Sequence, residues 1–363
     1  MPFSLIIRVF RPSSVIRHSD LLSDDHPRFD NPGKVPVRLR PFMRLLAFFG
    51  ILIAITVGTA LGLSAICSAL DIVVSTEHRM LIGFTAQLFG AVIAYALEAA
   101  LMERRWIPSE LDPRRVADLF KGMAVAALCT GLTMAILAAC GFYRIMAFDA
   151  AYNPLLDMLT LGLGAGIAEE LIMRGMVLRL LEEWLGSWYA LGISALLFGL
   201  AHWVNQDGSL WGGIAIAIEA GLLFGAIYMI TRSLWWCIGL HMAWNVLEGP
   251  VFGSIVSGSG EQRSWFIPQW SGPEIFTGGS FGIEASIIPV VLLGTLSMLI
   301  LLAIKRQGMV ILPSWQRKKR LQLPPGQLGT EHVSTEPSNV ELVGNDRTDA
   351  MKATSEDVGR LIE

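Results

Sequence analysis

The chain has 363 residues, of which 53% are hydrophobic and only 16% are charged. Soluble domains usually carry about 25% charged residues, so this composition excludes an ordinary soluble enzyme and a largely disordered chain. The formal net charge of −3 gives no sign of a nucleic-acid partner. The sequence therefore predicts an all-α, polytopic membrane helix bundle with about eight transmembrane helices.

Eight apolar segments approach the length of about 20 residues that a helix needs to cross a membrane. The predicted spans cover residues 45–70, 80–102, 122–142, 154–181, 184–203, 211–230, 234–251 and 285–304. Together they form a transmembrane bundle over residues 44–306, preceded by a basic N-terminal segment, 1–43. Met43 offers an alternative start. A polar tail, 307–363, follows and is predicted to be disordered.

Basic residues lie mainly on one side of the predicted spans. This arrangement puts 25 of the 28 Lys and Arg residues on the side of the two termini and leaves Arg79, Arg144 and Arg263 on the other. Cytosolic segments carry the excess of Lys and Arg in membrane proteins. We therefore expect both termini in the cytosol and an integral protein surrounded by membrane lipid, in the plasma membrane of a bacterium.

A cluster of three charged residues, Glu169, Glu170 and Arg174, lies within the fourth predicted span. Glu170 and Arg174 are four residues apart, so they share a helix face and can form an ion pair. Glu169 lies about 100° around the helix and has no such partner nearby. Ionisable residues within a membrane span are costly and often functional. An acid without a cationic partner in this setting suits a general base.

Two histidines interrupt later spans. His202 ends the pattern Phe198-x-x-x-His202 in the fifth span, and His241 and Asn245 share a helix face in the seventh. Either pattern alone also fits ordinary hydrogen bonding within a helix bundle. Counted from the cytosolic span ends, Glu169, His202 and His241 lie about 17, 21 and 14 Å deep at 1.5 Å per residue. We expect the three helices to bring these side chains together.

A carboxylate and two histidines in a wet pocket can activate water in two ways. In a metal-free version, Glu169 and His202 take a proton from water, and His241 with Asn245 stabilises the oxyanion. In the other version, a metal such as zinc is held by His202, His241 and Glu169 and keeps an open position for water. Both versions hydrolyse an amide or ester within the membrane. The sequence lacks the serine-hydrolase, nucleotide-binding and zincin motifs.

The ordered set Glu-Glu-x-x-x-Arg, Phe-x-x-x-His and His-x-x-x-Asn resembles the CPBP intramembrane proteases, the CAAX protease and bacteriocin-processing proteins also called the Abi family. The motif residues are Glu169, Glu170, Arg174, Phe198, His202, His241 and Asn245, and the resemblance covers about residues 154–250. It implies an all-helical endopeptidase in which Glu169 and His202 activate water while His241 and Asn245 form the oxyanion site. It also implies a membrane-associated peptide as substrate, prenylated at its C-terminus in the eukaryotic branch and diverse in bacteria.

Two other functions remain open from the sequence. One is a non-catalytic membrane scaffold or immunity protein on the same fold. The other is a proton-coupled transporter with Glu169, His202 and Glu219 as its relay. The remaining acids predict less: Glu98 and Glu248 are expected at the membrane interface, and Glu219 either supports the site or makes a structural hydrogen bond.

Overall fold

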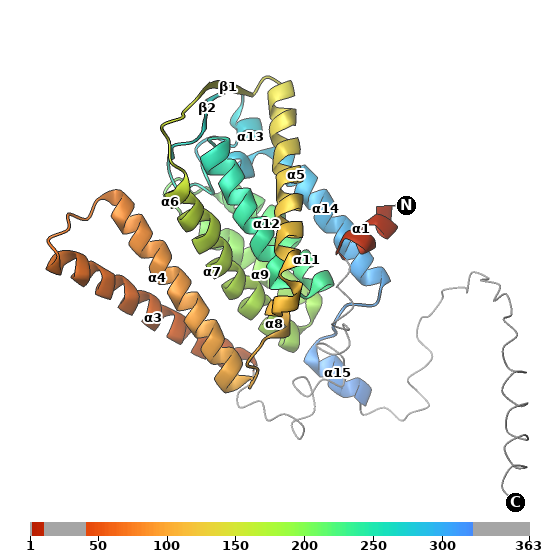
Figure 1. The fold of residues 1–363 in the computed structure, drawn as a ribbon. Helices are drawn as coiled ribbons and strands as arrows, with labels where there is room; N and C mark the ends of the chain where they lie inside the picture. The colour runs from red at the N-terminus through yellow and green to blue at the C-terminus, as the bar shows by residue number, and fades with distance from the viewer. Residues whose placement is uncertain (1, 11–40, 322–363) are drawn as a thin grey trace, which may run out of the picture. The chain divides into compact units, whose positions relative to one another are not determined.

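The computed structural model describes residues 2–10 and 41–321 and shows a bundle of helices with one small sheet (Figure 1). The α-helices are α1 (Pro2–Phe10), α3 (Pro41–Ala69), α4 (Thr76–Leu97), α5 (Ala117–Ala139), α6 (Leu155–Asp157), α7 (Gly166–Glu170), α8 (Arg179–Leu185), α9 (Ser187–Trp203), α10 (Leu210–Ile216), α11 (Leu223–Thr231), α12 (Leu234–Val246), α13 (Glu274–Thr277), α14 (Ile287–Arg306) and α15 (Ser314–Leu321). The strands are β1 (Tyr143–Phe148) and β2 (Phe266–Trp270), which pair antiparallel. Short 3₁₀ turns occur at η2 (Ser109–Leu111), η3 (Pro113–Arg115) and η8 (Ile283–Ala285).

Wider π-helical turns join several of these helices into longer rods. They are η1 (Glu98–Met102), η4 (Met158–Ala165), η5 (Leu171–Leu178), η6 (Ala217–Leu222) and η7 (Leu247–Val251). The fourth predicted span is one such rod, α6–η4–α7–η5–α8, and its charged pair Glu169 and Glu170 lies on α7 between two π-helical stretches. Because π-helical turns are frequent at functional sites, their position agrees with the site expected there.

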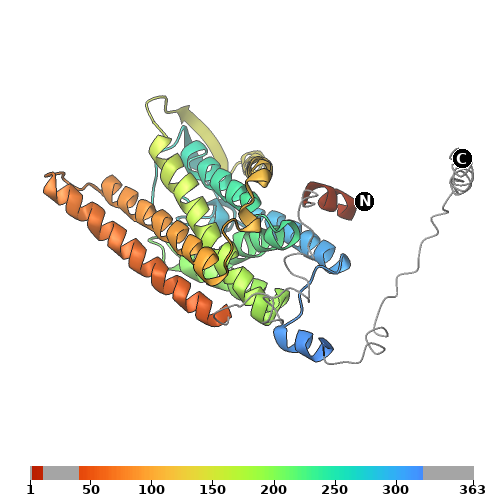
Figure 2. The same cartoon turned by 60° about the horizontal axis from the view of Figure 1, so that its bottom comes forward.

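All eight predicted spans fall on helical segments, and five of these helices are long and apolar enough to cross a membrane by length and composition. These five are Pro41–Ala69, His78–Met102, Pro113–Ala139, Leu210–Thr231 and Ile287–Arg306. The other three carry charged and polar residues of the expected site or, like α9, run for only 17 residues. The prediction of an all-α polytopic membrane bundle is thus confirmed. Figure 2 shows α3 and α4 lying side by side along their length.

Small residues allow the central helices to approach closely. A Cβ atom on Gly239 of α12 would lie 2.0 Å from the backbone oxygen of Leu119 in α5, and one on Gly122 would lie 2.2 Å from that of Trp236. Gly162 and Gly166 likewise press against α12, at Val246 and Met242. The glycine-rich stretch before Glu169 therefore serves helix packing, which fixes the distance between α7 and α12.

Two short helices lie within the segments that flank the predicted bundle. Within the N-terminal segment 1–43, residues 2–10 form α1, and its apolar side chain Phe10 packs against Trp236 with ring centroids 5.1 Å apart. Within the polar tail, residues 314–321 form α15, where the buried Arg317 donates a hydrogen bond to the backbone oxygen of Glu183. Long-range contacts thus order short pieces whose composition alone indicates coil. The rest of the tail, 322–363, lies outside the described residues.

The close packing of α5 on α12 predicts a position-specific effect of adding one methyl group. We expect Gly239→Ala to lower the free energy of unfolding by about 1–3 kcal/mol, because the new Cβ meets backbone that cannot move without separating the helices. Gly131→Ala on α5 is the matched control, since its Cβ would meet no atom within 4 Å. Thermal unfolding in detergent, followed by tryptophan fluorescence, measures both. Equal effects of the two variants would contradict this account.

Candidate active site

The paired acids of α7 occupy different environments. Glu170 is fully buried, whereas the side chain of Glu169 is 21% exposed. Neighbouring residues on a helix point about 100° apart, so one acid can face the protein interior while the other faces a cavity. This local geometry separates a structural carboxylate from an accessible one.

Glu170 is the anchor of a buried network. Its Oε1 atom accepts a hydrogen bond from Arg174 at 2.8 Å and contacts Nδ1 of His241 at 2.9 Å. Arg174 also donates to the backbone oxygen of Ala220 at 2.7 Å. Its guanidinium carbon lies 4.8 Å from the ring centroid of Phe198. The predicted pairing of Glu170 with Arg174 is therefore present, and it connects the fourth, fifth, sixth and seventh predicted spans.

The two histidines present the same ring nitrogen to Glu169. Nδ1 of His202 lies 2.8 Å from the backbone oxygen of Phe198, and Nδ1 of His241 faces the Glu170 carboxylate. Since both partners are acceptors, each Nδ1 carries a proton, which leaves each Nε2 available as an acceptor in the neutral ring. The two Nε2 atoms lie 3.9 and 3.8 Å from Oε2 of Glu169.

Asn245 lies one turn beyond His241 on α12, as predicted. Its side-chain nitrogen donates a hydrogen bond to the backbone oxygen of Leu161 at 2.9 Å. This bond uses one of the two amide N–H groups and holds the side chain at the wall of the cavity described below, beside His241. Asn245 therefore keeps a second N–H for a bound group.

Glu169, His202, His241 and Asn245 all line one cavity of about 400 Å³. Its walls also include Phe84 and Gln87 of α4, Ile172 and Met173 of η5, and Asn205, Val256, Ser257 and Ser259 of the connecting segments. The structure thus brings together the side chains that the sequence predicted to converge. The cavity is large enough for several water molecules and a short stretch of peptide.

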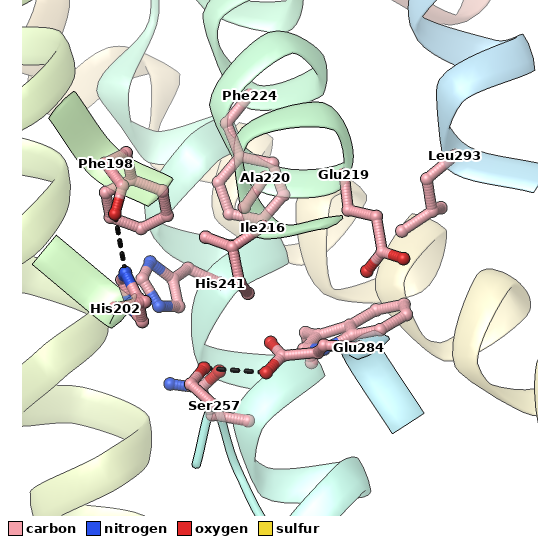
Figure 3. Close-up of a pocket in the computed structure, with 12 residues that line it drawn as sticks. Phe198, His202, Ile216, Glu219, Ala220, Phe224, His241, Ser257, Glu284 and Leu293 are labelled. Atoms are coloured by element: carbon pink, nitrogen blue, oxygen red, sulfur yellow. Dashed lines mark hydrogen bonds between the residues drawn. The ribbon is translucent and has the colours of Figure 1, made fainter. Parts of the chain in front are cut away.

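A smaller chamber of about 20 Å³, enough for one water molecule, lies behind the histidines. Figure 3 shows His202 and His241 on one side of it and Glu219 and Glu284 on the other. Glu284 accepts a hydrogen bond from Ser257 at 2.7 Å. Glu219 is 2% exposed, and neither of its oxygens has a hydrogen-bond partner.

Sequence reasoning missed part of this chamber. Glu284 lies in the short turn η8 and carried no motif, while Glu248, expected at the interface, is fully buried and bonded to Trp244. Glu219 did have a usable signal, because it is an acid in the middle of an apolar span. Its burial beside the chamber favours the supporting role over a structural hydrogen bond.

The donor types of the site suit a zinc ion in part. Two imidazole nitrogens and a carboxylate form a common catalytic set, and Glu170 behind His241 is the kind of carboxylate that orients a metal-binding ring. Ligands of tetrahedral zinc lie about 3.3 Å apart, given bonds of about 2.0–2.1 Å, and the separations from Glu169 are wider than that. Among the described residues, no group of three or more such side chains is gathered for a metal ion.

The chain is a helix bundle of membrane type in which an acid, two histidines and an amide line one cavity. A family model described as type II CAAX prenyl endopeptidase Rce1-like matches residues 151–247, which include every motif residue. The match covers 97 of the 363 residues and supports a relationship of this segment to the CAAX proteases. No curated protein and no solved structure matches the chain significantly. Similarity to this family implies a protease.

The contrasting surroundings of two buried acids predict opposite responses to the same substitution. Glu170→Gln should lower the free energy of unfolding by about 3–5 kcal/mol, because it leaves the buried Arg174 without its anion. Glu219→Gln should change it by less than about 1 kcal/mol or raise it, because Gln cannot carry the charge whose burial is costly. Unfolding in detergent, followed by tryptophan fluorescence, compares them. An equally large loss in Glu219→Gln would contradict the different roles assigned to the two acids.

Proposed function

We propose that the protein is an intramembrane endopeptidase that hydrolyses a peptide bond with water activated by Glu169. The main support for this proposal is the position of the Glu169 Oε2 atom, which lies 3.8 Å from Nε2 of His241 and 3.9 Å from Nε2 of His202. These separations exceed hydrogen-bond length, so the three groups surround a place for a small guest such as a water oxygen. Oε2 is also buried and has no hydrogen-bond partner in the protein.

In the metal-free version, Glu169 accepts a proton from water while the Nε2 atom of His202 orients it. The water oxygen forms a bond to the peptide carbonyl carbon, and the carbonyl oxygen becomes an oxyanion near Asn245 and His241. Collapse of this intermediate breaks the C–N bond, and the proton held by Glu169 passes to the leaving amine. The products are a carboxylic acid and an amine, so atoms and charges balance.

The role of His241 separates the two versions of the mechanism. Because Nδ1 of His241 already donates to Glu170, its Nε2 atom can donate to an oxyanion only when the ring is an imidazolium. The neutral ring instead presents an Nε2 lone pair, which suits a metal. In that version His202, His241 and Glu169 would hold the ion, and zinc would supply a Lewis acid for water and carbonyl.

Removal of either water-activating side chain tests the proposal. We expect Glu169→Ala and His202→Ala each to lower kcat/KM by about 10²–10⁴-fold, the usual contribution of general acid–base catalysis. The assay uses protein purified in detergent, with a prenylated CAAX-type peptide and a mixed pool of membrane peptides, and mass spectrometry of the products. Gln307→Ala, exposed and far from the cavity, is the control and should keep full activity. Cleavage that survives in both site variants would refute the site assignment.

Chelation then distinguishes the versions. The metal version predicts that a chelator abolishes cleavage, that zinc restores it, and that elemental analysis finds about one zinc per wild-type chain and less in His202→Ala. The metal-free version predicts full activity in chelator and no retained zinc. Measured zinc content supplies a readout that does not depend on activity.

Loss of cleavage in Glu169→Gln would also separate a protease from the alternative scaffold, which needs only binding. The transporter alternative requires a pathway open to both faces. The described residues favour the protease over it, because the end of the bundle away from the cavity is filled by buried ion pairs.

A further inference from the structure

The described residues that line the cavity around Glu169 lie towards one end of the bundle. Its outer wall is made by two connecting segments, residues 204–209 after α9 and residues 254–260 after η7, here called the mouth segments. They are joined by a hydrogen bond from the Asn205 side chain to the backbone oxygen of Ser257 at 2.7 Å. His202 is the second-last residue of α9, directly before the first mouth segment. The chain continues from the second segment into β2, so the mouth lies towards the end that carries the sheet (Figure 1).

Buried ion pairs close the opposite end. Arg44 of α3 pairs with Glu98 of η1 at 2.8 Å and with Glu183 of α8 at 3.1 Å. Arg232, before α12, pairs with Glu182 at 2.5 Å. The side chains of these pairs are at most 5% exposed. This ionic plug, Arg44, Glu98, Glu182, Glu183 and Arg232, ties the ends of four predicted spans together. It leaves the mouth as the described route from water to Glu169.

The charge distribution orients this asymmetric molecule. The connection from η1 to α5 at the plugged end contains Arg104, Arg105, Arg114 and Arg115, and α14 ends there in Lys305 and Arg306. The following chain bonds to Ser187 beside the plug, which fixes that end of α14. Among the described residues, the mouth end carries only Arg79, Arg144 and Arg263 as cationic side chains. Since the basic end of a membrane protein stays in the cytosol, the mouth faces the other side.

The cavity wall also selects the substrate by charge. Its described lining combines apolar side chains with amides and hydroxyls, and contains Glu169 but no Lys or Arg. A free C-terminal carboxylate bound near the scissile bond would meet Glu169 and no Lys or Arg side chain. An uncharged, extended stretch within a longer chain fits better.

We infer that the cavity opens on the non-cytosolic face and takes internal, uncharged stretches of polypeptides that reach that face, such as exported or membrane-anchored chains. With this orientation, prenylated C-terminal peptides that stay on the cytosolic side do not reach the opening of the cavity. The part of this inference that names a substrate rests on the proposed protease function. The direction of the opening is a property of the folded protein and can be measured without any cleavage.

Cysteine labelling in intact cells tests the direction of the opening. The four native cysteines are replaced by Ser or Ala, and one reporter at a time is introduced into the full chain. Ser259→Cys reports on the mouth, Gln307→Cys on the plugged end, and the restored native Cys140, exposed at the end of α5, on the sheet end. The probe is a membrane-impermeant maleimide, applied before and after permeabilisation.

We expect Ser259→Cys and Cys140 to label in intact cells and Gln307→Cys to label only after permeabilisation. Labelling of Gln307→Cys from outside, or of Ser259→Cys only after permeabilisation, would overturn the inference by reversing the orientation. Labelling of Cys140 without Ser259→Cys would overturn it by showing a closed mouth. Glu169→Ala in the same backgrounds should label identically, so failure of the inference is distinguishable from failure of the proposed protease activity.

Discussion

The whole site depends on one carboxylate, that of Glu170. A buried charge is costly unless it is paired. Glu170 is paired through Oε1 with both Arg174 and His241, while its Oε2 atom is buried without a hydrogen-bond partner in the described structure. Arg174 also donates a hydrogen bond to the backbone oxygen of Ala220, which connects the ion pair to the sixth predicted span. Loss of the Glu170 carboxylate would leave the buried charge of Arg174 unpaired in the middle of the bundle. Glu169, the neighbouring residue, points about 100° away from Glu170 around the helix and lines the cavity.

Local helical spacing made the Glu170–Arg174 pair predictable from the sequence. Residues four apart share a helix face, and this rule alone gives the Glu170–Arg174 pair and the common face of His241 and Asn245. The length of the apolar runs likewise placed helices in all eight predicted spans. These features need only the chain's own geometry over a turn or two, which a single sequence contains.

Features that depend on distant partners were beyond the sequence. Glu98 was expected to reach the interface, yet it is buried because Arg44, 54 residues earlier, pairs with it. Depth counted from span ends placed His202 near mid-membrane, whereas α9 ends one residue later and the mouth segments fold over the site. Glu284 lies at the same chamber as Glu219 only because the chain after η7 turns back into the bundle at η8. No periodic pattern in the sequence predicts that a distant part of the chain folds back in this way.

The two ends of the bundle differ, and this difference suits the site to hydrolysis rather than transport. Hydrolysis needs water and substrate to arrive, but no passage through the membrane, so a single opening is sufficient. The ionic plug fills the basic end with charges that satisfy one another, and such pairs would be disrupted by a water-filled path between them. The glycine contacts of α7 and α5 with α12 hold the helices too close for a second route nearby. Closure at one end and polarity at the other therefore arise from the same close packing that positions Glu169.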